Sequence, residues 1–385
     1  MKEKLWTGRY IHSLLLVFGV NVGVMLLHSV VAVYGTTLAA STVVGGYMIT
    51  AFQISAMLTR FVVKPLSERY TNKQLLLFGV MMTILAGVGY CTTTSIPVFL
   101  VFRAVHAFGF SLGLTCATAI STECIPHTRL SEGIGFTASA STLGTAIGPM
   151  VAIEILGEGY TNWQSLFVAI VIVSAITLVG SFLFKYTQKK QEESKNGAAI
   201  AKKKTSYKGL IVAAVFMFAG ITQSAINGYL TSFAKEMNLG NISFYFTVMA
   251  IATLGIRFCS VQIQEKIGMR MLVYISALSM GIGVFGVAFA KSAAFVVLMA
   301  IPFGLGMGCL YPIFNYRILR TVDITQHAFG ASMYYCSMDI AYGIGGFMWG
   351  YVAQWFGSNM VFVIAGSLIL VMLVLDTFIY KKWEL

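Results

Sequence analysis

The sequence predicts an all-α integral membrane protein in which twelve transmembrane helices form two pseudo-symmetric bundles of six. Three observations lead to this prediction. Hydrophobic residues make up 57% of the 385 residues and charged residues only 10%, whereas a soluble protein is usually about 25% charged. The apolar residues fall into runs of roughly 18 to 25, long enough to cross a bilayer core of about 30 Å as helices. A short charged pattern also recurs about half a chain length later, which indicates a duplicated unit.

Twelve apolar runs are the predicted transmembrane helices. They lie near 10–33, 43–64, 74–95, 98–121, 133–156, 163–185, 208–231, 243–263, 271–290, 294–317, 328–352 and 360–380. A polar, lysine-rich segment divides the chain into an N-terminal bundle at 1–185, a cytoplasmic linker at 186–207 and a C-terminal bundle at 208–385. The first run has no small-residue cleavage site, so it is predicted to be a membrane helix rather than a signal peptide.

The net charge of +12 is distributed as in a membrane protein rather than a nucleic-acid-binding protein. If the N-terminus is cytoplasmic, twelve spans place both termini and nearly all of the 26 Lys and Arg on the cytoplasmic side. The exceptions are Lys235, Lys291 and the intramembrane Arg103. This asymmetry follows the positive-inside rule, and binding of anionic lipid by the linker is the alternative interpretation. The compact loops favour a bacterial plasma (inner) membrane.

The sequence offers no candidate catalytic or metal site. Its six cysteines are scattered, with no CxxC pair and no metal-ligand spacing, so neither zinc nor disulfides are predicted. The loops are too short to hold a nucleophile and its base, which argues against a membrane-embedded enzyme. No glycine-rich phosphate-binding loop ending in Gly-Lys-Ser or Gly-Lys-Thr is present, so ATP is not expected to be the energy source.

The recurring pattern places an arginine within a span, two turns before an acid and two bases in the following loop. Its members are Arg60, Glu68, Arg69 and Lys73 in the first copy, and Arg257, Glu265, Lys266 and Arg270 in the second. Because six spans separate equivalent loops, both copies lie on the same face of the membrane.

These features resemble the major facilitator superfamily of transporters across essentially the whole chain. In that family the loop between spans 2 and 3 reads Gly-x-x-x-Asp-Arg-x-Gly-x-Arg. Here residues 64–73 keep an acid followed by a base, but Lys64 and Thr71 replace the two glycines. The loop at 261–270 keeps the acid, the base and one glycine. The resemblance implies two six-helix bundles that alternate access to one central site.

Two further motifs resemble features of the efflux branch of bacterial drug/solute:proton antiporters. Arg103, within the fourth span, looks like the family's intramembrane arginine motif. Gly144, Gly148 and Pro149, within the fifth span, are similar to the glycine–proline motif of antiporters. The family's usual glycine pair after the proline is missing at 152–153. The resemblance therefore implies an exporter, with the fifth span as its weaker support.

The duplicated charged loops are predicted to form a cytoplasmic gate. A carboxylate at the end of a span can pair with nearby bases and face the N-terminus of a neighbouring helix. Glu123, at the end of the fourth span, resembles the second acid of the family's charge relay. Such a cluster would latch the cytoplasmic faces together in the outward-open state. The alternative interpretation is that positive loops only anchor the topology.

Charged residues within the spans are the candidates for proton coupling. Asp339 lies midway along the eleventh span, where the membrane disfavours an ionised carboxylate, and it is the first candidate proton carrier. Glu154 is the second. Arg103 is predicted to bind an anionic group or to tune a neighbouring acid, or alternatively to snorkel to the outer surface. Packing along a glycine stripe is the alternative for Asp339, and Asp376 is predicted to have a surface role.

Uncharged polar side chains within the spans are predicted to point inward, because lipid would leave them unsatisfied. They are Asn21, His28, His106, Gln223, Asn227, Tyr311 and Asn315. Either they line a substrate cavity or they bond neighbouring helices together.

The resemblance implies a secondary active transporter that exports a small, amphipathic organic solute in exchange for protons by alternating access. The alternative is a proton-coupled symporter or a facilitator that takes up a small polar metabolite. The proton gradient is the expected energy source, with no cofactor. The expected partners are the substrate, protons and membrane lipids, and the chain is expected to be a monomer that binds no nucleic acid.

Overall fold

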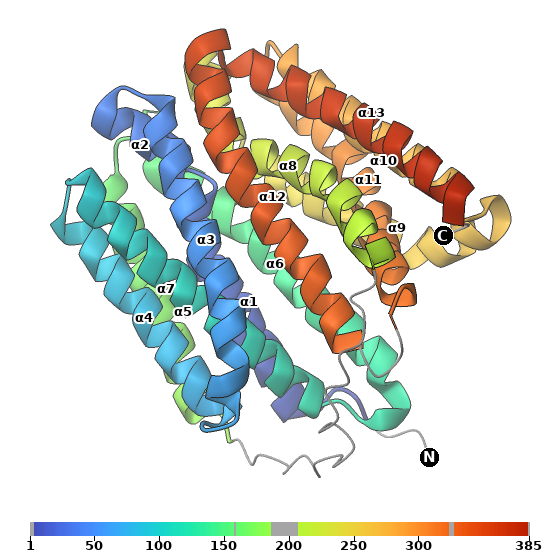
Figure 1. The fold of residues 1–385 in the computed structure, drawn as a ribbon. Helices are drawn as coiled ribbons and strands as arrows, with labels where there is room; N and C mark the ends of the chain where they lie inside the picture. The colour runs from blue at the N-terminus through green and yellow to red at the C-terminus, as the bar shows by residue number, and fades with distance from the viewer. Residues whose placement is uncertain (1–3, 158, 186–206, 323–326, 384–385) are drawn as a thin grey trace.

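The computed structural model describes residues 4–157, 159–185, 207–322 and 327–383. These residues form long helices and no strand (Figure 1). The predicted linker at 186–207 lies outside the described residues, apart from Tyr207, which begins a helix.

The helices follow one another in chain order. Those before the linker are α1 (Gly8–His28), α2 (Val31–Ala39), α3 (Thr42–Ser67), α4 (Asn72–Thr92), α5 (Ile96–Glu123), the short 3-10 helix η1 (His127–Arg129), α6 (Leu130–Leu156) and α7 (Trp163–Leu183). Those after it are α8 (Tyr207–Glu236), α9 (Phe244–Ile267), α10 (Met269–Ala288), α11 (Ala293–Arg320), α12 (His327–Phe356) and α13 (Ser358–Trp383).

The predicted membrane fold is confirmed. Within the described ranges, 11 helical segments are long and apolar enough to cross a membrane, with α1 and α2 counted as one segment. The helix α12 is not among them, but it runs for 30 residues and packs between α3 and α8. The first predicted span, 10–33, ends too early, because after a break at Ser29 and Val30 the helix α2 continues to Ala39.

The two copies of the charged loop start their following helices in different ways. In the first copy, Thr71 caps α4: its side chain accepts the backbone N–H of Gln74, and the Gln74 side chain accepts the backbone N–H of Thr71. This reciprocal arrangement satisfies two amide groups that a helix start otherwise leaves free. In the second copy, Gly268 precedes α10 with φ of +81°, a conformation that glycine adopts without steric cost.

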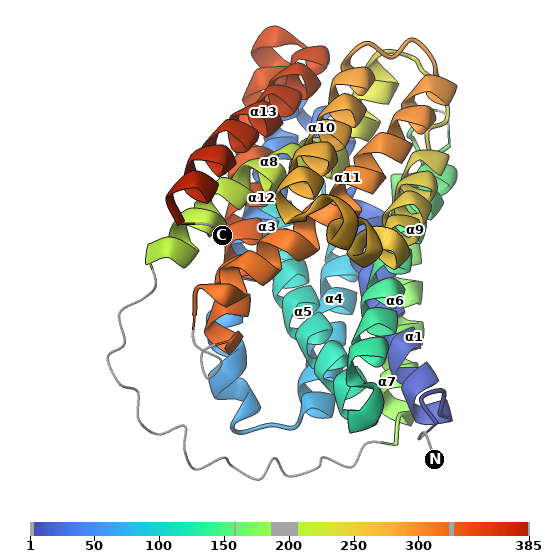
Figure 2. The same cartoon turned by 90° about the vertical axis from the view of Figure 1, so that its right-hand side faces the viewer.

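The helices before and after the linker form two neighbouring groups, which meet where α3 lies beside α12, α6 beside α9 and α2 beside α8 (Figures 1 and 2). Small residues make the closest of these contacts possible. A side chain on Gly46 of α3 would lie 2.6 Å from the carbonyl oxygen of Gly346 of α12. The glycine stripe of the eleventh span therefore packs against α3, in the close approach that small residues permit.

Candidate functional site

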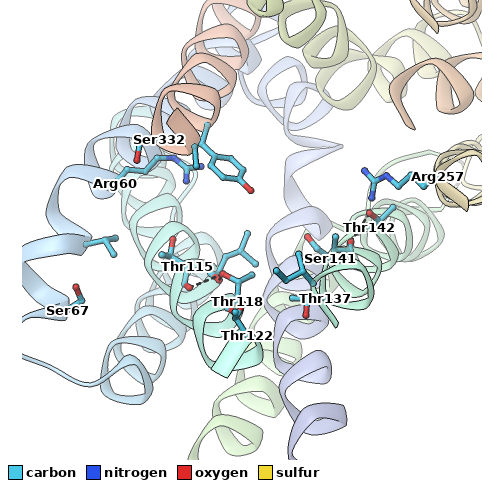
Figure 3. Close-up of a pocket in the computed structure, with 16 residues that line it drawn as sticks. Arg60, Ser67, Thr115, Thr118, Thr122, Thr137, Ser141, Thr142, Arg257 and Ser332 are labelled. Atoms are coloured by element: carbon cyan, nitrogen blue, oxygen red, sulfur yellow. Dashed lines mark hydrogen bonds between the residues drawn. The ribbon is translucent and has the colours of Figure 1, made fainter. Parts of the chain in front are cut away.

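A cavity of about 780 Å³ opens between helices of both groups (Figure 3). It lies at the end of the molecule where α3 and α5 finish and where α6 and α12 begin, which is the face predicted to be cytoplasmic. Its polar lining consists of Arg60, Ser67, Thr115, Thr118, Thr122, Thr137, Ser141, Thr142, Arg257 and Ser332. Hydroxyl groups and two arginines therefore dominate the polar part of the wall.

The opposite end is closed by contacts between the two groups of helices. The Thr42 hydroxyl donates to the carbonyl oxygen of Gly350 at 2.8 Å, and the hydroxyls of Tyr47 and Tyr351 lie 2.8 Å apart. Both contacts join α3 to α12. These contacts hold α3 against α12 at that end, where a separate hollow of about 620 Å³ lies beside Glu154, Lys235 and Asn241.

Glu154, a predicted proton carrier, takes part in this closed end. Its Oε1 atom accepts hydrogen bonds from Asn241 at 2.7 Å and from the Ser243 hydroxyl at 2.8 Å, both from the segment before α9. Close by, the Lys235 ammonium lies 5.7 Å from the centre of the Tyr160 ring. Burial raises the pKa of the Tyr160 phenol to about 12, so this ring stays neutral beside the lysine.

An ion pair at the inner end of the cavity joins the two groups of helices. Arg60 of α3 donates from Nε to Oδ2 of Asp339 of α12, and from Nη2 to Oδ1 at 3.3 Å. Side-chain exposure is 31% for Arg60 and 11% for Asp339. The prediction assigned Arg60 to the gate and Asp339 to proton coupling, and their contact was missed. A charged residue within each of two spans was the only sequence signal for it.

Arg60 also lines a second, smaller cavity of about 150 Å³ deeper in the molecule. His28, Asn227 and Asp339 line it as well, with Asn227 donating to the Tyr342 hydroxyl at 2.9 Å. Arg60 thus lines both cavities and stands between the larger and the smaller one. Of the predicted cavity residues, His28 and Asn227 are the two that reach it among the described residues.

The other predicted cavity residues mostly contact neighbouring helices. The Tyr311 hydroxyl donates to Oε1 of Gln223 at 2.5 Å, which joins α11 to α8. Asn21 donates to the Val17 carbonyl of its own helix at 2.7 Å. Asn315 has a buried Oδ1 atom without a hydrogen-bond partner among the described residues. The Tyr311–Gln223 pair thus bonds two helices together, as the alternative interpretation has it, whereas Asn21 bonds only within its own helix.

Arg103 is completely buried, so the interpretation that it snorkels to the surface is wrong. Its guanidinium lies 4.5 Å from the centre of the Phe52 ring, and Nε donates to the Met48 carbonyl at 3.3 Å. Its two terminal nitrogens have no hydrogen-bond partner within the described ranges. One turn on, His106 lies 3.2 Å from the Tyr90 hydroxyl through Nδ1. Neither Arg103 nor His106 lines either cavity, but Phe52, against which the Arg103 guanidinium lies, lines the smaller one.

The predicted gate residues lie at the open face. Lys73 donates to the carbonyl oxygens of Phe182 and Phe184 at 2.9 and 2.7 Å, and so caps the end of α7. Glu123 accepts a hydrogen bond from Asn72 at 2.9 Å. Four other members are exposed and form no ion pair with any residue that the structure describes: Glu68, Arg69, Glu265 and Lys266. The latch was predicted for the opposite, outward-open state.

Asp376 does not have the surface role that was predicted. It is 2% exposed and accepts a hydrogen bond from Arg317 at 2.6 Å. The Arg317 guanidinium also lies 5.5 Å from the Phe314 ring centre and 5.9 Å from that of Tyr380. The error came from placing Asp376 by its distance from the span's end, since α10 and α8 pack against its helix and Arg317 of α11 pairs with it.

The glycine–proline motif forms a helix contact. A side chain on Gly144 would lie 2.7 Å from Cβ of Asn21, and one on Gly148 would lie 2.5 Å from Cβ of Met25. Both glycines therefore let α6 approach α1, and Pro149 stands within α6.

The profile of the Major Facilitator Superfamily matches residues 13–333, and the chain belongs to this superfamily. This confirms the family resemblance, and because the superfamily consists of transporters, the prediction that the chain is not an enzyme. The chain is therefore a multi-pass membrane transporter.

Two curated relatives span nearly the whole chain. One is the staphylopine export protein of Staphylococcus aureus, 23% identical over 367 residues, which are 91% of each chain. Another is an uncharacterised transporter of the superfamily from Methanocaldococcus jannaschii, 22% identical over 360 residues, which are 89% of this chain and 91% of the relative.

Solved structures show the same fold. A nucleoside transporter aligns with a TM-score of 0.75 at 13% identity, over 97% of this chain and all 100% of its own. A peptide transporter aligns with a TM-score of 0.76 at 13% identity, over 97% of this chain and 95% of its own. At this level of identity the likeness concerns the fold alone.

Proposed function

We propose that this protein moves a small, amphipathic organic solute out of the cell in exchange for protons. The superfamily supports transport, and the staphylopine export protein supports the outward direction. The observation that carries proton coupling is the ion pair between Arg60 and Asp339, which joins the two groups of helices at the inner end of the cavity.

Asp339 is the proposed proton carrier, because its charge decides whether this ion pair exists. When ionised, Asp339 attracts Arg60 and ties α12 to α3; when protonated, it loses that attraction. The adjacent guanidinium favours the ionised carboxylate. A proton taken up from outside would therefore leave Asp339 when the protein is in the present state, with the large cavity open to the cytoplasm, and would enter that cavity. The solute would then travel outward on the return step.

The remaining roles follow from position. The bundles at 1–185 and 208–385 are the proposed rocking units, and Glu154 is proposed to hold their outer ends together in this state. Arg103 is proposed to keep α5 and α3 in register rather than to carry a proton. The proposed setting is the plasma membrane, with both termini cytoplasmic, a monomeric chain, and the proton gradient in place of any cofactor.

The test is proton movement in proteoliposomes that contain a pH-sensitive dye, with organic anions, cations and neutral solutes supplied in turn. We expect solute-dependent proton movement in the wild type, loss of proton movement in Asp339→Asn, and full activity in the exposed Glu132→Gln as the matched control. Asn keeps the side-chain shape but cannot exchange a proton in this range. Unaltered coupling in Asp339→Asn would remove this acid from the mechanism.

Uptake of a polar metabolite by symport or facilitated diffusion is the second candidate. The absence of the usual glycines at 152–153 favours it, because this is where the chain departs from the antiporter motif. The direction of solute accumulation under an imposed pH gradient separates the two. Solute that accumulates on the same side as the incoming protons would establish symport, and flux without proton movement would establish a facilitator.

A further inference from the structure

We propose that the solute is an organic anion and that Arg257 is the residue that binds its charged group. This inference rests on the proposed function to the extent that the large cavity is the transport pathway. Three observations carry it: the charge of Arg257, the composition of the cavity wall and the spacing of the internal repeat.

Arg257 lies on α9 and lines the cavity with no carboxylate partner among the described residues. Its Nε atom is buried and has no hydrogen-bond partner among the described residues. The ionisable groups that interact with it are the phenol of Tyr334 and the thiol of Cys309, neither of which supplies a negative charge when protonated. Arg257 as a whole is only half-buried, so its guanidinium lines the cavity with Nε shielded from water, and a carboxylate, sulfonate or phosphate suits such a group well.

The wall around Arg257 favours an anion over a cation. Among the described residues that line this cavity, arginines are the only charged side chains. Asp339 lines the smaller cavity instead and is already paired with Arg60. Figure 3 shows Arg60 and Arg257 on opposite sides of the space, with hydroxyl-bearing side chains between them. Low-dielectric walls around one sign of charge concentrate the opposite sign.

The hydroxyl groups can assist without cost to their helices. Thr115, Thr122 and Thr142 each donate to a carbonyl oxygen four residues earlier on the same helix. Such a carbonyl normally also accepts a helix N–H, so it stays satisfied when the hydroxyl turns away. Each hydroxyl can therefore rotate to donate to an oxygen of the bound anion.

The repeat explains why Arg257 has no carboxylate partner among the described residues. The spacing that separates Arg60 from Arg257 also separates Thr142 from Asp339, and it separates the first residues of α6 and α12. By this register, Thr142 occupies the position of α6 that corresponds to Asp339 of α12, and α6 packs beside α9 as α12 packs beside α3. The second arginine of the repeat thus faces a hydroxyl-bearing helix position where the first meets a carboxylate.

Exchange with protons requires that the anion uses Arg257 and leaves Arg60 in its pair. If the anion withdrew Arg60 from Asp339, the exposed carboxylate would gain a proton as the anion bound. Anion and proton would then move together, which is symport. Because Thr142 stands where the other half has Asp339, Arg257 is free to bind the solute while Arg60 stays paired with the proton carrier.

The test is ligand-dependent thermal stabilisation of the purified full-length protein in detergent. The probes are succinate, tricarballylate, an aryl sulfonate and a phosphonate, each beside a neutral analogue such as succinamide or the triamide of tricarballylic acid. We expect the wild type to be stabilised by at least one anion and by none of the neutral analogues.

Four variants locate the binding group. Arg257→Gln and Thr142→Asp should both weaken anion binding by about ten- to hundredfold. The first removes the positive charge, and the second pairs that charge with a carboxylate of the protein. Thr142→Asn, which has the same shape as Asp without the charge and keeps a hydrogen-bond donor, should lose much less affinity than Thr142→Asp. Arg320→Gln removes an exposed positive charge from the same face and should also be unaffected.

Several outcomes would overturn the inference. They are stabilisation by no anion of the panel, equal stabilisation by the neutral analogues, and unchanged anion affinity in both Arg257→Gln and Thr142→Asp. Failure of proton exchange is a separate result: Arg257-dependent anion binding without coupled proton movement would leave the anion site standing. If a cation or a neutral solute drives proton movement independently of Arg257, the proposed proton exchange stands and the anion site does not.

Discussion

The two copies of the repeated pattern differ at the arginine that begins each of them. Arg60 of the first copy forms an ion pair with Asp339 across the two groups of helices. Arg257 of the second copy lines the same cavity with no carboxylate beside it among the described residues. The two copies therefore share a backbone frame, while the residue that faces the arginine is a carboxylate in one copy and a threonine in the other. This difference underlies the two binding functions that we propose for one cavity.

The loops that follow these arginines also differ, because each begins its next helix in a different way. The first copy begins α4 with a threonine that caps the helix through its side chain. The second begins α10 with a glycine in a left-handed conformation. Both solve the same problem, which is to satisfy and orient the first turn of a helix at the membrane surface.

The largest effect on stability is expected at Arg317 and Asp376, the buried ion pair that serves as the reference for this comparison. With exposures of 3% and 2%, neither charge has access to water. Asp376→Asn should therefore lower the free energy of unfolding by about 3–5 kcal/mol, because it leaves Arg317 buried and uncompensated. Thermal unfolding in detergent measures this loss. The double variant Arg317→Met with Asp376→Leu should recover most of it, and a loss below about 1 kcal/mol in the single variant would mean that water reaches the pair.

A smaller effect is expected when the Arg60–Asp339 pair is broken, because Arg60 is 31% exposed. Arg60→Gln should cost about 1–2 kcal/mol of stability, less than a fully buried pair. Exchanging the two residues, as Arg60→Asp with Asp339→Arg, should restore part of this loss. A double-mutant cycle on unfolding free energies measures the coupling. A coupling energy of zero would mean that the pair does not hold the two groups of helices together.

The smallest effects are expected at the helix starts, where they separate the two loops. Thr71→Ala should cost about 1 kcal/mol through loss of the cap, and Thr71→Gly only a few tenths. Gly268→Ala should cost about 1–2 kcal/mol, because alanine is strained at positive φ. Unfolding of the three variants under one condition tests the contrast. Equal losses for Thr71→Gly and Gly268→Ala would show that the loops do not differ in this respect.

The local patterns of the sequence were sufficient for the fold. Run length and composition predicted the membrane helices, because a helix that crosses lipid must be apolar along its whole length. The charged repeat predicted two related halves and the family. The errors were at ends and edges, such as the early end of the first span, where the apolar signal fades before the helix does.

Contacts between distant segments were decided by the tertiary structure alone. Arg60 and Asp339 are separated by 279 residues, and nothing near either one in the sequence points to the other. The burial of Arg103 and Asp376 likewise depends on which face of each helix its neighbours cover. A hydrophobic pattern can be recognised within a single segment of the sequence. The pairing of two opposite charges depends on which two segments pack together. The sequence by itself therefore determined that this is a transporter of two related halves. The packing of those halves decided which of its arginines lines the cavity with no carboxylate beside it among the described residues.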